Sequence, residues 1–382
     1  MPDSMTMPPQ REDRIAYLLG PERCDGWQPL VTAVPDPLMA ADGQERHANF
    51  SRFTRSWLDK PFVFRCGASA PSRHFASKGG SNAYLRSFVL DLNNFCRMAQ
   101  LTPGAGVTVQ LGDDDLHVPP HRAPGGRVYA KARVISTRCG SLLPLSTNRL
   151  WPIHAHPDGS FANVSNQIQH PFGRFGATSR QSEIRFTPLV PWSQKRGAFV
   201  WRGATTGFWH GGQHLRRHFV HSMSSSHDVR FVRSMSNHTG KLKLPCAANE
   251  FVCHPNHTGN AMNQLQILKY KYALSLEGND CATNLKWLMA QNSVVVMPLP
   301  RIETWLMEGL LRPWVHYVPL DDPTRADALL DWLEAHEADC LRIVRNANAW
   351  IQAVISDLFG LVAPVMQVGA VPSTWPTLSQ GR

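Results

Sequence analysis

Three consecutive carboxylates, Asp113, Asp114 and Asp115, follow an apolar stretch that alternates as a half-buried strand does and ends at Gly112. Neighbouring carboxylates raise one another's pKa, which suits a general base that takes a proton from a hydroxyl. An Asp-x-Asp pair could instead hold a divalent metal ion. A solvated turn would need no chemistry at all, and the local sequence leaves all three interpretations open.

A second candidate site is a glycine turn in the stretch "LSLEGNDCATNLKW". The turn lies between a predicted strand and a predicted helix, so Glu277, Gly278, Asn279 and Thr283 would stand where unpaired N–H groups attract phosphate. An ordinary tight turn capped by Asp280 or Thr283 is the alternative.

The stretch "FVWRGATTG" predicts another strand that ends in a glycine turn. Arg202 precedes Gly203, and Thr205 and Thr206 add hydroxyl groups. An arginine here could bind a diphosphate through two parallel hydrogen bonds. A surface arginine at a turn is the alternative, and neither glycine turn has the spacing of a dinucleotide fingerprint or a P-loop.

Four histidines recur at helical spacing just after this turn, and such a set could ligate zinc. They are His210, His214, His218 and His221. Arg216 and Arg217 beside them would repel a divalent cation, so we favour contact with solvent or phosphate and predict no metal site.

The second half of the chain alternates between strand and helix patterns, which predicts a parallel α/β sheet. Strands are predicted at 197–203, 271–279, 293–299 and 313–320, and helices at 213–223, 282–291 and about 325–359. The first half carries a predicted helix at 83–99 and strands at 107–111 and 127–135. A Pro- and Gly-rich connection near 154–176 suggests three parts, 1–170, 171–360 and a tail at 361–382.

The composition is that of a globular chain of 382 residues with 43% hydrophobic residues, enough for two domains. No run reaches the roughly 18 apolar residues of a membrane span, and "MPDSMTMPPQREDR" lacks the apolar core of a signal peptide. We therefore expect a cytoplasmic protein with its eight cysteines reduced.

The positive charge of the chain is concentrated in the segment 171–245, which holds 12 Lys or Arg and only two acidic residues. A basic band of this kind favours an anionic ligand, although a solvated basic face would explain it as well. A nucleic-acid-binding module is one alternative, but no zinc finger or aromatic-glycine stacking signature accompanies the band. We predict no nucleic-acid partner.

Two longer blocks resemble a known family. "KRGAFVWRGATTG" is followed about seventy residues later by "KYKYALSLEGNDCATNLKWLMAQNSVVVMPLPRIETWLMEGLLRPWVHYVPL". Together they resemble the capsule-associated and lipopolysaccharide-modifying glycosyltransferases, which form glycosyltransferase family 90 with the eukaryotic protein O-glucosyltransferases. The resemblance covers about residues 192–355.

The resemblance implies a GT-B fold, in which two Rossmann-like domains with parallel sheets face a cleft. The second domain would bind a nucleotide sugar, usually a UDP-sugar, and the last helix would cross back to the first domain. The family inverts the anomeric centre without a metal or another cofactor. Counting back from Val118 and Pro119 places the family's catalytic base at Asp114, or at Asp113 if the register slips by one.

One departure concerns the arginine that faces the diphosphate in the eukaryotic enzymes, because Asn284 occupies that position here. Arg202, Arg216, Arg217 or Lys286 could supply the missing charge. The expected acceptor is a lipopolysaccharide core or a capsular glycan, reached through peripheral contact with the inner membrane. A family member that has lost catalysis and binds the sugar nucleotide as a scaffold is the remaining alternative.

Overall fold

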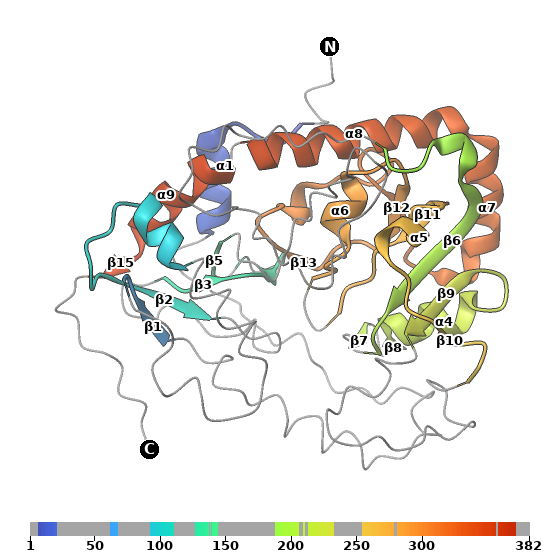
Figure 1. Cartoon of the computed structure of the whole chain (residues 1–382), viewed down its shortest axis with the longest axis horizontal. Coiled ribbons are helices and arrows are strands. Elements are labelled where there is room, and N and C mark those ends of the chain that lie inside the picture. Colours follow the sequence, from blue (N-terminus) through green and yellow to red (C-terminus); the bar gives the residue numbers. More distant parts are fainter. Residues whose placement is uncertain are drawn as a thin grey trace, which may run out of the picture.

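The fold was analysed in a computed structural model of the chain. It describes residues 7–20, 62–67, 92–110, 127–136, 138, 140–143, 188–205, 209–210, 213–232, 254–278, 281–356 and 358–371. The elements form two groups, each around its own sheet, and the long helix α8 (Glu337–Ser356) runs along one side from the larger group toward the smaller (Figure 1). The aspartates at 113–115 and Asn279 lie outside the described residues.

The larger group is built on a six-stranded sheet whose neighbouring strands are all parallel. Its strands are β6 (Arg196–Gly203), β9 (Asp228–Val232), β10 (Thr258–Gly259), β11 (Tyr270–Leu274), β12 (Val294–Met297) and β14 (Val318–Pro319). Their spatial order, β10-β9-β6-β11-β12-β14, is the 3-2-1-4-5-6 order of a Rossmann sheet. The prediction of a parallel α/β sheet in this half is therefore confirmed.

Helices cover both faces of this sheet, because alternate strand residues point to opposite sides. Phe199 and Trp201 of β6 pack with α4 (Leu215–Met223) and α7 (Ala326–Ala335), whereas Val200 packs with α6 (Leu285–Met289) and the second half of α8. Four short helical turns also belong to this group. They are α5 (Gln264–Ile267) and the 3-10 turns at Trp192–Gln194, Glu308–Leu310 and Pro323–Arg325.

The smaller group is built on a mixed sheet of β1 (Phe62–Arg65), β2 (Gly106–Gln110), β3 (Tyr129–Ala130), β5 (Ser141–Leu142) and β15 (Ala370–Val371). Strands β1 and β15 run antiparallel to β2, whereas β3 runs parallel to it. The prediction of a parallel sheet in both halves therefore does not hold for these residues. The antiparallel pairing of both β1 and β15 with β2 makes this sheet mixed.

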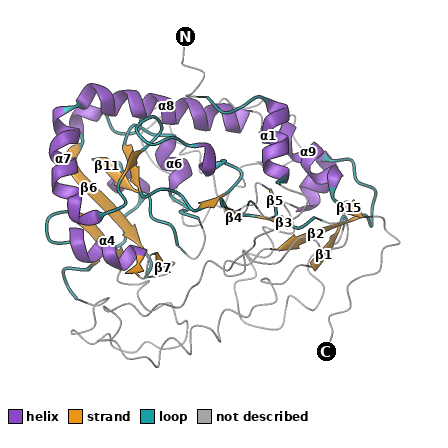
Figure 2. Cartoon of the chain, turned by 180° about the vertical axis from the view of Figure 1, so that it is seen from behind, coloured by secondary structure: helices purple, strands orange, loops and turns teal. Residues whose placement is uncertain are grey.

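The end of the chain returns to the smaller group. Helix α9 (Leu358–Val368) lies beside α1 (Arg11–Leu19), as both views show, and β15 follows it onto β2 (Figures 1 and 2). Residues 361–371, expected to begin a tail, thus form a helix and a strand. Among the described residues, no helix combines the length and apolar character needed to cross a membrane.

A second link joins the groups near their middle, where β4 (Arg133–Val134) pairs antiparallel with β13 (Ile302–Glu303). A small hairpin of β7 (Trp209–His210) and β8 (Gln213–His214) precedes α4. The strand predicted at 127–135 is thus two short strands with different partners. The strand predicted at 313–320 is reduced to β14, and the long amphipathic helix breaks at His336 between α7 and α8.

The expectation of eight reduced cysteines is wrong for one pair, because Cys66 and Cys96 form a disulfide with a Cα–Cα distance of 5.7 Å. Cys66 follows β1 and Cys96 lies on a helix at 92–98. Their positions, 30 residues apart in sequence, resemble no disulfide or metal motif, so only the packing of this helix against the strand reveals the pairing. Cys281 and Cys340 are buried free thiols.

Candidate functional site

The two glycine turns singled out in the sequence meet at one edge of the larger sheet. Strand β6 is the first strand, and the chain builds outward from it first through β9 and β10 and then through β11, β12 and β14. The order therefore reverses between β6 and β11, and ligands of open α/β sheets bind outside the carboxyl ends of the strands at such a point. Gly203 ends β6, and Gly278 follows β11.

Arg216, at the start of α4, ties these two turns together. Its Nη1 donates to the carbonyl of Ala204 at 3.2 Å, after β6. Its Nε and Nη2 donate to the carbonyls of Glu277 at 3.0 Å and Leu276 at 3.1 Å, after β11. The guanidinium also lies 5.4 Å from the ring centre of Trp201, within the range of a cation–π contact. In this structure Arg216 thus holds the backbone of the site.

Both turn glycines are required by these neighbours and not by an unusual backbone angle. A Cβ atom at Gly203 would lie 2.3 Å from the Trp201 ring, and one at Gly278 would lie 2.8 Å from Nη2 of Arg216. The glycines therefore let Trp201 and Arg216 pack directly on the two turns. The motifs "Trp-Arg-Gly" and "Leu-Glu-Gly" form one packed unit.

Glu277 fixes the other side of the second turn. Its Oε1 accepts hydrogen bonds from the backbone N–H groups of Arg301 at 2.8 Å and Ile302 at 3.0 Å. Burial raises the pKa of the Glu277 carboxyl to about 7, although the two N–H donors and the charge of Arg301 act in the opposite direction. The turn after β11 is thereby joined to the segment that leads into β13.

A small pocket opens beside this turn, at the carboxyl ends of β11 and β12. The residues that line it include Ser275, Glu277, Cys281, Met297, Ile302 and Glu308. Most of its wall is apolar, with two carboxylates among the polar groups. Its volume of about 10 Å³ is roughly the space that one water molecule needs, so the pocket is a niche beside the two turns and not a cavity of ligand size.

Arg202 is engaged elsewhere. Its Nη2 lies 2.6 Å from Oδ1 of Asp228 at the start of β9, and its other nitrogens donate to the carbonyls of Trp201, Asp228 and Asn260. Asp228 also accepts from the Tyr270 hydroxyl at 2.8 Å. Burial opposes ionisation, but these hydrogen bonds outweigh it and hold the pKa of Asp228 below its ordinary value. A diphosphate at Arg202 would have to compete with this ion pair.

The remaining predicted residues are divided between the site and the core. Asn284 joins the start of α6 to the end of β11, because its amide donates to the carbonyl of Leu274 at 2.9 Å and its Oδ1 accepts from Ser275. Thr283 is exposed beside it.

Lys286 is fully buried, and its Nζ lies 3.5 Å from Oε1 of Glu308. It therefore reaches the pocket only through Glu308, and it does not offer an exposed charge to a diphosphate. Arg217 is buried on α4, and Thr205 is half-buried after β6.

Three contributors escaped the sequence analysis: Asp228, Glu308 and the backbone N–H groups of the 301–302 segment. Asp228 is one of only two acidic residues in the basic segment 171–245 and stands beside an apolar run, a signal that could have identified a strand start with an ion pair. The charged partner of Glu308, Lys286, lies 22 positions away, and only the contact with Thr304, four residues before it, is local. The candidate bases Asp113 and Asp114 lie outside the described residues, so their role stays a prediction.

The site thus belongs to a Rossmann-like α/β region with a pocket near the point where its strand order reverses. Residues 173–357, which contain this region, match the family described as Glycosyl transferase family 90. For this stretch of the chain, the match confirms the family resemblance that the two blocks in the sequence carry.

Two known proteins are similar to this chain. O-glucosyltransferase LpsA from Dichelobacter nodosus is 36% identical over 163 residues, which are 42% of this chain and 45% of that protein. Uncharacterized protein 035R from Invertebrate iridescent virus 3 is 26% identical over 172 residues, which are 41% of this chain and 15% of that protein. The chain therefore spans less than half the length of either relative.

Proposed function

We propose that this protein is an inverting glycosyltransferase that moves a hexose or pentose from a UDP-sugar to a hydroxyl group of a glycan. The observation that carries the proposal is the meeting of the two glycine turns of the family-matched region where the strand order of the sheet reverses. We place the candidate donor site around these turns, with the small pocket lined by Ser275, Glu277 and Glu308 as one part of its wall.

The proposed reaction needs one base and a leaving group. Asp114, or Asp113, takes the proton of the acceptor hydroxyl as its oxygen attacks the anomeric carbon. The bond from that carbon to the diphosphate oxygen breaks on the opposite face, so the configuration inverts and UDP leaves with the bonding electrons. Arg216 and Glu277 hold the two turns in place, which limits the motion of the bound donor.

The acceptor is proposed from chemistry and from the relative's name. LpsA is named an O-glucosyltransferase, which is consistent with transfer to a hydroxyl. The basic segment 171–245 suits an acceptor that carries phosphate, such as a lipopolysaccharide core or a capsular glycan at the inner membrane. The reaction as proposed uses no metal and no cofactor besides the donor.

Turnover of radiolabelled UDP-sugars on a panel of glycan acceptors, with and without EDTA, tests the proposal. We expect release of UDP and labelled glycan that persists in EDTA. We also expect a loss of at least about a hundredfold in Asp114→Asn or Asp113→Asn, because general-base catalysis contributes factors of this size. Full activity in both variants would exclude these aspartates as the base. UDP binding without transfer across the whole panel would favour the inactive scaffold.

A further inference from the structure

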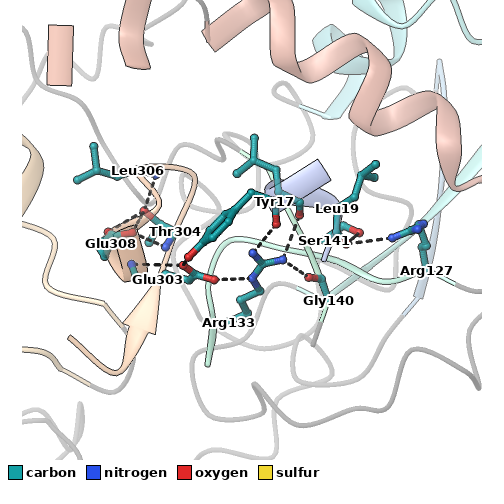
Figure 3. A network of polar contacts seen from close by, with 12 residues as sticks. Tyr17, Leu19, Arg127, Arg133, Gly140, Ser141, Glu303, Thr304, Leu306 and Glu308 are labelled. Carbon is teal, nitrogen blue, oxygen red and sulfur yellow. Dashed lines mark hydrogen bonds and ion pairs between the residues drawn. The ribbon is translucent and has the colours of Figure 1, made fainter. Parts of the chain in front are cut away.

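A buried ion pair joins the two groups of elements at the β4–β13 link. Nε of Arg133 lies 2.8 Å from Oε1 of Glu303, and both side chains are 0% exposed (Figure 3). Arg133 also donates to the carbonyls of Tyr17, Leu18 and Gly140 at 2.6 to 3.2 Å. The guanidinium is thus held by the end of α1 and by the turn before β5, and it presents one edge to Glu303.

Tyr17, from the N-terminal helix α1, is a second hydrogen-bond partner of Glu303. Its hydroxyl donates to Oε2 of Glu303 at 2.6 Å, across 286 positions of sequence. The other donor to this oxygen among the described residues is the N–H of Gly309, at a longer 3.4 Å. A Cβ at Gly309 would lie 2.6 Å from the Tyr17 hydroxyl, so the chain leaves room for this contact.

Glu303 is one residue from the wall of the candidate donor pocket. Ile302 lines that pocket, and the N–H groups of Arg301 and Ile302 are the donors that hold Glu277. The segment 301–303 is therefore fixed from one side by Glu277 and from the other by Tyr17 and Arg133. A shift of Glu303 would move the wall and the turn after β11 together.

We propose that Tyr17 is a positioning residue that sets the wall of the donor pocket from the opposite half of the molecule, through Glu303 and β13. The proposal deepens the proposed function and rests on it for the identity of the ligand. Its structural part, the coupling of Tyr17 to residues 301–302, stands independently.

Tyr17→Phe tests this inference, because it removes one hydroxyl and keeps the ring. Tyr129→Phe is the matched control. Tyr129 is fully buried, whereas Tyr17 is half-buried, and the Tyr129 hydroxyl donates to the carbonyl of Val365 at 2.6 Å and accepts from the N–H of Gly369. It lies in the smaller sheet and has no hydrogen bond to β13 among the described residues. Both variants lose one hydrogen-bonded hydroxyl, and the control loses the more buried one, so general destabilisation should be at least as large in the control.

The first readout is amide hydrogen exchange of residues 300–304 in the ligand-free protein. We expect exchange at Arg301 and Ile302 to rise roughly tenfold or more in Tyr17→Phe and to stay at the wild-type rate in Tyr129→Phe. Equal exchange in the two variants would overturn the inference. The result does not depend on whether the protein transfers sugar.

The second readout is steady-state transfer from the UDP-sugar. In Tyr17→Phe we expect KM for the donor to rise about tenfold with kcat within a factor of two, because a displaced wall weakens donor binding and leaves the base untouched. A fall in kcat alone would contradict a positioning role. Altered exchange with no transfer in any protein would uphold the coupling and refute the proposed function.

Discussion

Lys195 illustrates, at the scale of one residue, a buried charge that has no acidic partner among the described residues. Its ammonium is within a side chain only 6% exposed, where it donates to the carbonyl of Leu268 and to the hydroxyl of Ser293, the latter at 2.9 Å. Burial lowers the pKa of Lys195 from 10.5 to about 7. Two neutral acceptors compensate only in part for the lost hydration of the charge.

This lowered pKa predicts a pH-dependent stability. Between about pH 7 and pH 10 the unfolded chain binds a proton at Lys195 that the folded protein has released. Because of this group, the free energy of unfolding should therefore increase by up to about 1.4 kcal/mol per pH unit as the pH rises through this range. It should decrease by the same amount per unit as the pH falls toward 7. Lys195→Met should remove that slope and stabilise the protein at neutral pH.

Urea unfolding of wild type and Lys195→Met at several pH values measures the slope. Lys269→Met is the comparison, because Lys269 is an exposed lysine directly before β11. If wild type and Lys195→Met show the same dependence on pH, the buried ammonium does not titrate as described.

The sequence indicates single candidate residues of the site more readily than the side chains that these residues contact. Four of the donor-binding candidates, Gly203, Gly278, Arg216 and Glu277, lie together in the structure, and their role in binding stays a prediction. Arg202, for which the sequence left a diphosphate contact open, pairs with Asp228 at the start of β9, a strand that the sequence does not predict. Long-range pairing decides what a charged side chain contacts, and local spacing does not encode it.

At the scale of elements, Arg216 joins the turns after β6 and β11. Arg216→Lys should lower the free energy of unfolding by about 2 kcal/mol, because a lysine ammonium cannot reach three carbonyls spread over two turns. It should also weaken binding of UDP, since both turns border the candidate site. Thermal unfolding and UDP titration measure the two effects.

Arg345→Lys is the matched control, because Arg345 is exposed on α8. It should leave both the melting temperature and the affinity for UDP unchanged. Equal behaviour of the two substitutions would mean that Arg216 does not order the turns.

The elements predicted best are those with a strong apolar pattern of their own. Strands β6, β11 and β12 and helix α4 were found because their buried residues follow one another or recur at the period of a helix. Strands β4 and β13 have two residues each and exist only because they pair with one another. No window of sequence can predict such strands, and they carry the link between the two groups.

At the scale of the whole molecule, two links join the two groups within the described residues. Helix α8 leads from the larger group to α9 and β15 on the smaller sheet (Figure 2). The β4–β13 pair forms the second link, near the candidate site. The sequence predicted two domains and a tail, and the family resemblance implied a parallel sheet in each domain. The smaller sheet is instead mixed, because β1 and β15 run antiparallel to β2, and β15 arrives from the other end of the chain.

The Cys66–Cys96 disulfide belongs to this scale, because it bears on where the chain folds. Disulfides are typical of oxidising compartments, whereas the sequence predicts a cytoplasmic protein. The Cys66→Ser/Cys96→Ser double variant should lose about 2–4 kcal/mol of unfolding free energy through the greater freedom of its unfolded chain. Urea unfolding measures the loss, and a stability equal to that of wild type would contradict a structural role for the disulfide.

Thiol counting on protein denatured without reductant, directly after isolation from cells, tests whether the bond forms there. We expect at least two more thiols to become available after reduction. An unchanged count would show that the two cysteines stay reduced in the compartment where the protein is made.

The central claim is that the edge of the larger sheet beside Gly278 binds a uridine nucleotide, and calorimetric titration of UDP into wild type and Ala282→Phe tests it most directly. Ala282 lines the small pocket and is 7% exposed, so a phenyl ring there would overfill the pocket and displace the turn beside Gly278. We predict saturable binding to wild type and at least tenfold weaker binding to the folded variant. Undetectable binding to wild type, or equal affinity in both proteins, would contradict the claim.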